Sequence, residues 1–165
     1  MSRRSAAVVV ITATERRIID TLAGILPAAA ASYEQCVGDL GGPARLSYRG
    51  AAHELREVLR EALDLLAPDG EVMAETGFKL EGELTRPTQR QKALFVLRKR
   101  RLPREAMRAP ELTISLADEL GAQITRSAYT RGSISAHGLS SLQEVRQLKM
   151  YVDAVLAELL EIYKQ

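Results

Sequence analysis

The 165-residue chain fits one domain and is long enough to bury a hydrophobic core without disulfides. Its composition, 46% apolar and 27% charged with a net charge of +2, excludes a disordered chain, and the single cysteine, Cys36, excludes an internal disulfide and a cysteine-rich zinc site. The low cysteine content favours a reducing, cytoplasmic compartment, and neither a metal nor another cofactor is expected.

The N-terminal part of the chain predicts an interrupted helix behind an apolar lead. Residues 5–11 are alanine-rich and β-branched, which fits either a short strand or an apolar lead-in to a helix. Because the run is short and charged residues follow at once, we expect neither a cleaved signal nor a membrane span. The helix that starts near Thr14 should be kinked or interrupted at Pro27, resume, and end before Gly41-Gly42-Pro43.

Residues 44–67 give the clearest helical pattern of the chain. Polar residues fill one side of this segment, and apolar residues recur at helical spacing on the other, at Ala52, Leu55, Leu59, Leu63 and Leu66. Pro68-Asp69-Gly70 should end the helix. Residues 71–85 contain two glycines and few periodic apolar positions, so they predict a connecting loop.

Three further helices are predicted in the second half. A basic helix at 88–99 follows Pro87, and a linker with two prolines covers 100–110. A helix at about 111–130 should bury one apolar face, formed by Leu112, Leu116, Leu120 and Ile124. The last helix should run from about Ser140 to Tyr163, with Ser140 or Ser141 as its N-cap and Glu144 completing a capping box.

These elements predict an all-α fold, a compact bundle of four to six helices. We expect a single domain over residues 1–165. Within it, residues 1–43 form an N-terminal helical extension and residues 44–165 form the core.

Basic residues concentrate in one window. Between Arg86 and Arg108 nine basic residues face a single acidic one, so this window carries a net charge of +8 and the rest of the chain −6. Such a stretch can attract a phosphate backbone, and we assign four candidate substrate-binding residues to it: Arg98, Lys99, Arg100 and Arg101. The alternative is an ordinary solvated surface at the end of a helix.

The segment Tyr129-Thr130-Arg131-Gly132-Ser133-Ile134-Ser135-Ala136-His137-Gly138 lies between two long predicted helices. If it is helical or nearly so, Arg131 and His137 stand close to two turns apart and can line one crevice. These two residues are the candidate catalytic pair. Candidate substrate-binding residues beside them are Ser133, Ser135, Arg126 and Tyr129.

This segment resembles the active-site motif of the HEPN superfamily, an arginine followed after four to six residues by a histidine, at the junction of the last two main helices. The resemblance extends over about residues 45–163. More narrowly, the regions around Tyr48 and from Thr85 to Leu97 resemble bacterial proteins described as predicted nucleases associated with PIWI-type defence loci. The resemblance implies a metal-independent endoribonuclease of a defence or toxin–antitoxin system, and a homodimer with two Arg–His pairs in one cleft. The implied partners are RNA and an antitoxin or a defence-complex protein.

The residue types suit this chemistry. A 2′-hydroxyl can cleave RNA by attacking the adjacent phosphate, if a base removes its proton and a cation stabilises the charged phosphorane. Neutral histidine transfers protons near pH 7, and arginine is a permanent planar cation that fits phosphate oxygens. The product would carry a 2′,3′-cyclic phosphate.

Two other functions remain open. Gly132 stands where the family often has Asn, Asp or His, which favours a non-catalytic helical module that dimerises or binds nucleic acid. A metal-dependent nuclease is the third possibility, which EDTA would separate from the first. The two residues of the pair would then have structural roles: His137 would cap a helix or bond a loop carbonyl, and Arg131 would serve as an ion-pair partner.

Overall fold

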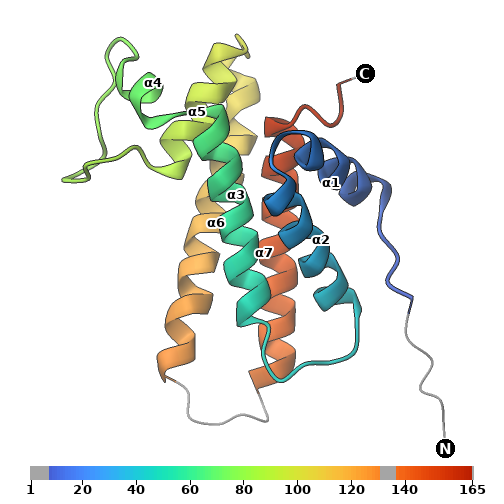
Figure 1. Ribbon diagram of the computed structural model, residues 1–165. Coiled ribbons are helices and arrows are strands. Elements are labelled where there is room, and N and C mark those ends of the chain that lie inside the picture. Colours follow the sequence, from blue (N-terminus) through green and yellow to red (C-terminus); the bar gives the residue numbers. More distant parts are fainter. Residues whose placement is uncertain (1–7, 131–136, 165) are drawn as a thin grey trace, which may run out of the picture.

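The computed structural model describes residues 8–130 and 137–164, with backbone alone for 127–130 and 137–141 (Figure 1). These residues contain no strand, which confirms the predicted all-α class. The helices are α1 (Ala13–Ile25), α2 (Pro27–Gly41), α3 (Arg49–Leu66), α4 (Asp69–Met73), α5 (Gln89–Lys99), α6 (Arg104–Thr130) and α7 (His137–Leu159). The bundle holds one helix more than predicted, because the expected loop after residue 70 includes the short α4.

The first two helices are separated by one residue, as Pro27 predicts. Thr12 and Glu15 cap α1 reciprocally through each other's backbone N–H groups. Pro27 is the first residue of α2, where its missing N–H needs no helical partner. Residues 8–12 are irregular, so the part of the 5–11 segment that the structure describes forms an apolar lead-in and not a strand.

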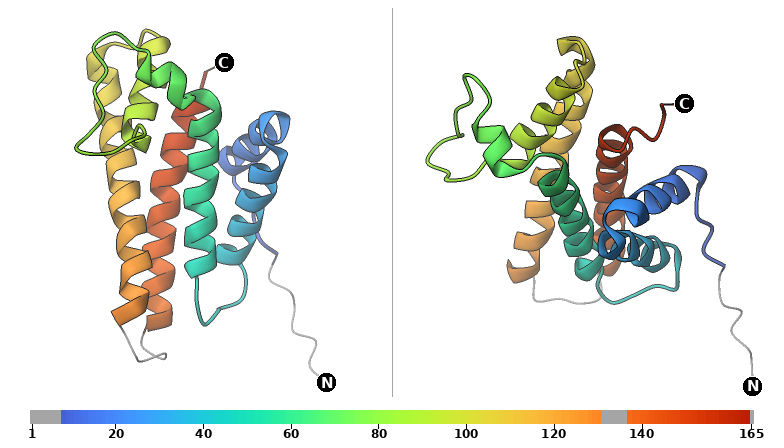
Figure 2. Two further views of the ribbon diagram at one scale, coloured as in Figure 1. Left: turned by 60° about the vertical axis from the view of Figure 1, so that its left-hand side comes forward. Right: turned by 45° about the horizontal axis from the view of Figure 1, so that its top comes forward.

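The core lies where α3, α6 and α7 run side by side, with α2 packed against α3 (Figures 1 and 2). The predicted stripe on α3 is buried, apart from Leu66, which is partly buried. Tyr33 from α2 is fully buried and donates a hydrogen bond from Oη to Asp153 Oδ1 on α7 at 2.6 Å. Among the described residues, no helix is long and apolar enough to cross a bilayer.

Helix α6 departs from the prediction in two ways. It begins at Arg104, not at residue 111, and carries Pro110 inside it. Proline is tolerated there because it lies near the exposed start of the helix, where the unpaired carbonyl of Ala106 can reach water. The buried face agrees with the prediction only toward the end of the helix: Ile124 is buried and Leu120 packs against the core, whereas Leu112 is 62% exposed and Ile114 and Ala117 are buried in its place. A strict four-residue spacing drifts around a helix of 3.6 residues per turn, so the predicted stripe rotates off the core.

Helix α7 begins at His137, three residues before the predicted start. Ser140 and Ser141 therefore lie within the helix, and the predicted N-cap with Glu144 is wrong. The apolar residues of α7 are largely buried, with Val145, Leu148 and Val152 at no exposure.

The two longest helices, α6 and α7, define the long axis of the molecule. Helix α6 has 27 residues and α7 has 23, so α6 alone is about 40 Å long at 1.5 Å per residue. Figure 2 shows them side by side, with the end of α6 and the start of α7 at one end of the bundle and the α5–α6 junction at the other. This separation decides which residues of one chain can meet.

The single cysteine should be chemically inert in the folded protein. Cys36 is buried and its Sγ donates to the carbonyl of Ala51 at 3.6 Å. Burial, assisted by the carboxylate of Glu54, raises the pKa of the Cys36 thiol to about 12. At pH 8 the thiolate fraction is then about 10³-fold below that of an ordinary thiol, and we expect labelling by a disulfide reagent to slow by a similar factor. Fast labelling without guanidinium would contradict this burial.

Candidate functional site

The predicted catalytic residues bracket the connection between α6 and α7. Arg131 follows Thr130, the last residue of α6, and His137 is the first residue of α7. Arg131, Ser133 and Ser135 lie outside the described residues. For Tyr129 and His137 the structure describes the backbone alone. The roles of these side chains therefore remain predictions. The end of α6 and the start of α7 define the end of the bundle to which they apply.

Close packing joins α3 to α6 toward this end. Arg56 on α3 reaches across to α6, where its Nη1 donates to Thr125 Oγ1 at 3.3 Å. The crossing depends on Gly121, because a Cβ there would lie 2.7 Å from Arg56 Cδ. A larger residue at position 121 would displace the Arg56 side chain from this seam between α3 and α6.

The same seam holds a partly buried acid. Burial raises the pKa of Asp118 on α6, and the nearby Arg56 guanidinium opposes the rise. The buried Nε of Arg56 has no hydrogen-bond partner among the described residues. In the sequence, Arg56 falls on the polar side of the 44–67 segment, and its interaction with Asp118 could not be predicted, because no spacing along one helix reveals a pair that forms between two helices.

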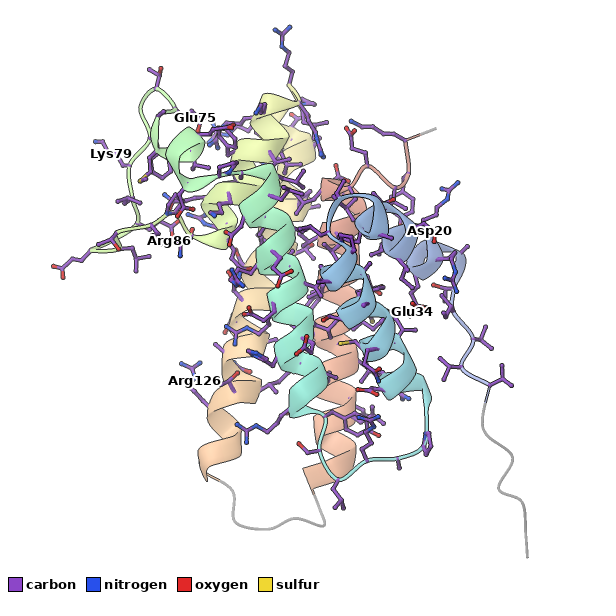
Figure 3. All side chains as sticks on the ribbon, in the orientation of Figure 1. Asp20, Glu34, Glu75, Lys79, Arg86 and Arg126 are labelled. Carbon is purple, nitrogen blue, oxygen red and sulfur yellow. The ribbon has the colours of Figure 1, made fainter. Side chains whose placement is uncertain are left out.

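Arg126 is the one candidate near the α6–α7 connection whose side chain is described. It lies about one turn before Thr130, is exposed, and has no ion-pair partner among the described side chains (Figure 3). Its charge is therefore available to a ligand at this end of the bundle. His53, the second histidine of the sequence, is exposed on α3.

Three of the four cations predicted to bind substrate in the basic window have protein partners. Arg98 bonds both carboxylate oxygens of Glu75, from Nε at 2.9 Å and from Nη2 at 2.5 Å. Lys99 Nζ lies 3.1 Å from Glu71 Oε2. Arg100 donates to the carbonyl of Glu158 at 3.0 Å and caps the end of α7. The charges of these three side chains are therefore engaged within the protein at the α5 end.

The other basic residues at the start of the window are paired as well. Arg86 contacts Asp69, and Arg90 contacts both Glu81 and Glu111. Most of these acidic partners come from residues 64–81, just upstream in the sequence. The local charge of +8 is therefore largely neutralised by the segment that folds against it.

Arg101 is the exception among the four. It is exposed, has no partner among the described residues, and has φ of 58°. It follows the C-cap of α5, with its N–H bonded to Arg98 O and the next N–H bonded to Leu97 O. This is the Schellman arrangement, in which glycine is the usual residue at Arg101's position. At this position the chain has an exposed arginine, although glycine adopts a positive φ with less strain.

Lys92, Asp64 and Asp69 form the most buried ionic cluster of the α5 end. The Lys92 side chain is 5% exposed, and its ammonium lies between the two carboxylates, one from α3 and one from α4. Across the described part of the chain, no three His, Cys, Asp or Glu residues are grouped to hold a metal ion. The cluster joins three helices and is best understood as part of the scaffold.

The predicted site residues do not converge within one chain. Arg98 to Arg101 lie at the α5–α6 junction, whereas Arg126, the end of α6 at Thr130 and the start of α7 at His137 lie at the other end of the bundle. Figure 3 shows the same division, with Glu75, Lys79 and Arg86 around α4 and α5 and Arg126 at the other end. The length of α6, about 40 Å, separates the two groups.

Exposed arginines therefore lie toward both ends of α6 in this all-helical fold, Arg104 and Arg108 at its start and Arg126 near its end. The sequence matches the family described as predicted pPIWI-associating nuclease over residues 28–149, about three quarters of the chain, from α2 into α7. The chain belongs to this family. No curated protein and no solved structure matches it. The match confirms the predicted link to nucleases of PIWI-type loci, and the HEPN assignment stays a prediction.

Proposed function

We propose that the protein is a metal-independent endoribonuclease of a bacterial PIWI-linked defence system, with Arg131 and His137 as its catalytic pair. One observation carries the proposal: in a chain of a nuclease family, the connection between the two longest helices starts at Arg131, and the second of these helices starts at His137. That is the location in which the HEPN motif is expected.

The proposed reaction needs no group beyond these side chains and the RNA. The imidazole of His137 removes the 2′-OH proton, and O2′ attacks the adjacent phosphorus. The bond from phosphorus to O5′ breaks, and the leaving 5′-oxygen takes up a proton. Arg131 stabilises the additional negative charge on the phosphorane oxygens. The products are a 2′,3′-cyclic phosphate and a 5′-hydroxyl.

A second copy of the chain would supply the missing acid. When a single histidine acts as the base, the leaving group must take its proton from water, which is a much weaker acid than an imidazolium, so a second histidine would speed the reaction. We therefore propose a homodimer in which the α6–α7 connections of both copies meet, so that one His137 acts as base and the other as acid. Arg126, Tyr129, Ser133 and Ser135 would line the shared cleft and hold the RNA.

The second candidate is a non-catalytic module that binds RNA or a defence-complex protein. Gly132 favours it, because the family often has a polar residue next to the motif arginine. This module and the enzyme make opposite predictions for turnover. An antitoxin partner belongs to the toxin–antitoxin form of the proposal and would have to cover the same cleft.

The experiment is a mixing test run in EDTA. We expect R131A and H137A proteins each to be inactive alone, and an equimolar mixture, after subunit exchange, to recover measurable cleavage. A mixed dimer still has one arginine and one histidine in the shared cleft. Each variant at the same total concentration, without its partner, is the control.

Failure of rescue would exclude the composite dimeric site but not cleavage within one copy. An inactive wild-type protein that still binds RNA would favour the non-catalytic module.

A further inference from the structure

Cations without protein partners gather at the α5–α6 junction, away from the proposed cleavage segment. Arg101, Arg104 and Arg108 are exposed, and none has an ion-pair partner among the described residues. Three unpaired arginines fall within eight residues, in a window whose other six cations all have carboxylate partners, so this end of the bundle carries uncompensated positive charge.

Two of these arginines line a pocket between α5 and α6. The pocket encloses about 450 Å³, and its lining consists of Leu94, Arg98, Arg104, Met107, Arg108 and Glu111. Arg104 and Arg108 are one helical turn apart, so they project on the same side of α6. The charges of Arg98 and Glu111 are already compensated by partners outside the pocket. The uncompensated charge of the pocket is therefore +2.

A second hollow adjoins the first. It encloses about 500 Å³ between α5 and residues 75–81, and Leu94 and Arg98 line both hollows. Lys79 lines its outer side and has no ion-pair partner among the described residues. Phe78 and Leu94 add apolar surface. The two hollows share Leu94 and Arg98, and we call them together the groove. Its unpaired cations are Arg104, Arg108 and Lys79, and its other charged lining residues are paired with one another: Glu75, Glu81, Arg90, Arg98 and Glu111.

The chemistry of this groove fits a nucleotide strand. Guanidinium groups bind phosphate oxygens in a fixed, bidentate geometry, and bases need apolar or planar surfaces against which to stack. Arg104 and Arg108 also lie in the first turns of a 27-residue helix, whose N-terminus favours a negative charge. Arg101 stands beside them in a conformation that glycine adopts more easily.

We propose that this groove is a second nucleic-acid site, which binds the phosphodiester backbone of an RNA strand through Arg104 and Arg108, about 40 Å from the α6–α7 connection. The inference takes its RNA class from the proposed function and adds an anchoring site outside the cleavage segment. Within one copy, only an RNA of about 12 or more stacked nucleotides, at about 3.4 Å each, reaches both sites. Long RNA should therefore bind more tightly than short RNA.

Binding is measured by fluorescence anisotropy on the H137A protein, which leaves the RNA intact. The probes are labelled RNAs of about 6 and about 24 nucleotides, half and twice the spanning length. R104Q/R108Q is compared with R16Q/K164Q, which removes the same charge from two exposed ion pairs elsewhere. We expect R104Q/R108Q to bind the long RNA about tenfold more weakly at about 0.15 M salt, with a salt slope lower by about 1.4. The control should match the parent protein.

Equal loss in both double variants would overturn the proposal, because it would show a general effect of charge. The proposal would also be overturned if long RNA bound no more tightly than short RNA. Displacement of the long RNA by a low concentration of AMP would overturn it as well, because it would identify a site for free nucleotides. Since the readout is binding, a protein that never cleaves RNA can still support the groove. If the wild-type protein cleaves RNA but the R104Q/R108Q variant binds long RNA as tightly as the parent protein, the groove proposal is refuted and the proposed cleavage function is not.

Discussion

An H137A variant is expected to cleave RNA about 10²–10⁴-fold more slowly than the wild-type protein, because it lacks the general base. RNA affinity should change little, since the phosphate-binding arginines remain. The rates are measured under single-turnover conditions, with binding measured separately. Because His137 begins α7, circular dichroism should show an unchanged helix content.

His53 provides the matched control, as the other histidine of the chain. It is exposed on α3, so H53A removes the same kind of group without disturbing the core. We expect H53A to keep the wild-type rate within about twofold. An H137A protein as active as H53A would remove histidine chemistry from the account.

The largest effect on stability is expected from Lys92→Ala. The ammonium of Lys92 is buried between Asp64 and Asp69, and its Nζ lies 2.5 Å from Asp69 Oδ1. Removing it leaves two partly buried carboxylates facing each other. Breaking a buried ion pair costs about 3–5 kcal/mol, and we expect about 3 here because each carboxylate keeps an arginine. The melting temperature should fall by about 6–12 °C.

Lys99→Ala is the control on the same helix. Lys99 and Glu71 form an ion pair whose side chains are 62% and 55% exposed, so its loss should change the free energy of unfolding by less than about 1 kcal/mol. Lys92→Met separates charge from packing, and should be nearly as unstable as Lys92→Ala. Equal stability of the Lys92 and Lys99 variants would contradict the buried cluster.

Local patterns predict the helices that carry a strong stripe or a clear breaker. The stripe of α3 and the break at Pro27 both agree with the structure, since each depends on residues close in sequence. The start of α6 does not, because Pro110 reads as a stop signal but costs little near an exposed helix end. Helix α4 is too short for any periodic signal.

The basic window shows what a single sequence conceals. Net charge along the chain is readable, but pairing depends on which segments fold together. Glu75 stands 23 residues before Arg98 and nonetheless bonds it through both carboxylate oxygens. The acidic residues just upstream in the sequence indicate that much of this charge can be neutralised, but only the fold shows that Arg101, Arg104 and Arg108 stay unpaired among the described residues.

The candidate catalytic pair, Arg131 and His137, is identified from a sequence motif. The structure shows at which end of the bundle the two helices that flank this motif terminate. The sequence could not predict that the basic window lies at the opposite end, because that depends on α6 being one long helix. The separation changes the account of RNA binding from one surface to two sites.

The most direct test of the proposed function is the chemistry of the RNA ends left by the purified wild-type protein in EDTA. The account predicts cleavage without added metal, with 2′,3′-cyclic phosphate on one product and 5′-hydroxyl on the other. Cleavage that requires a divalent metal, or products with 5′-phosphate and 3′-hydroxyl ends, would contradict an Arg131–His137 mechanism.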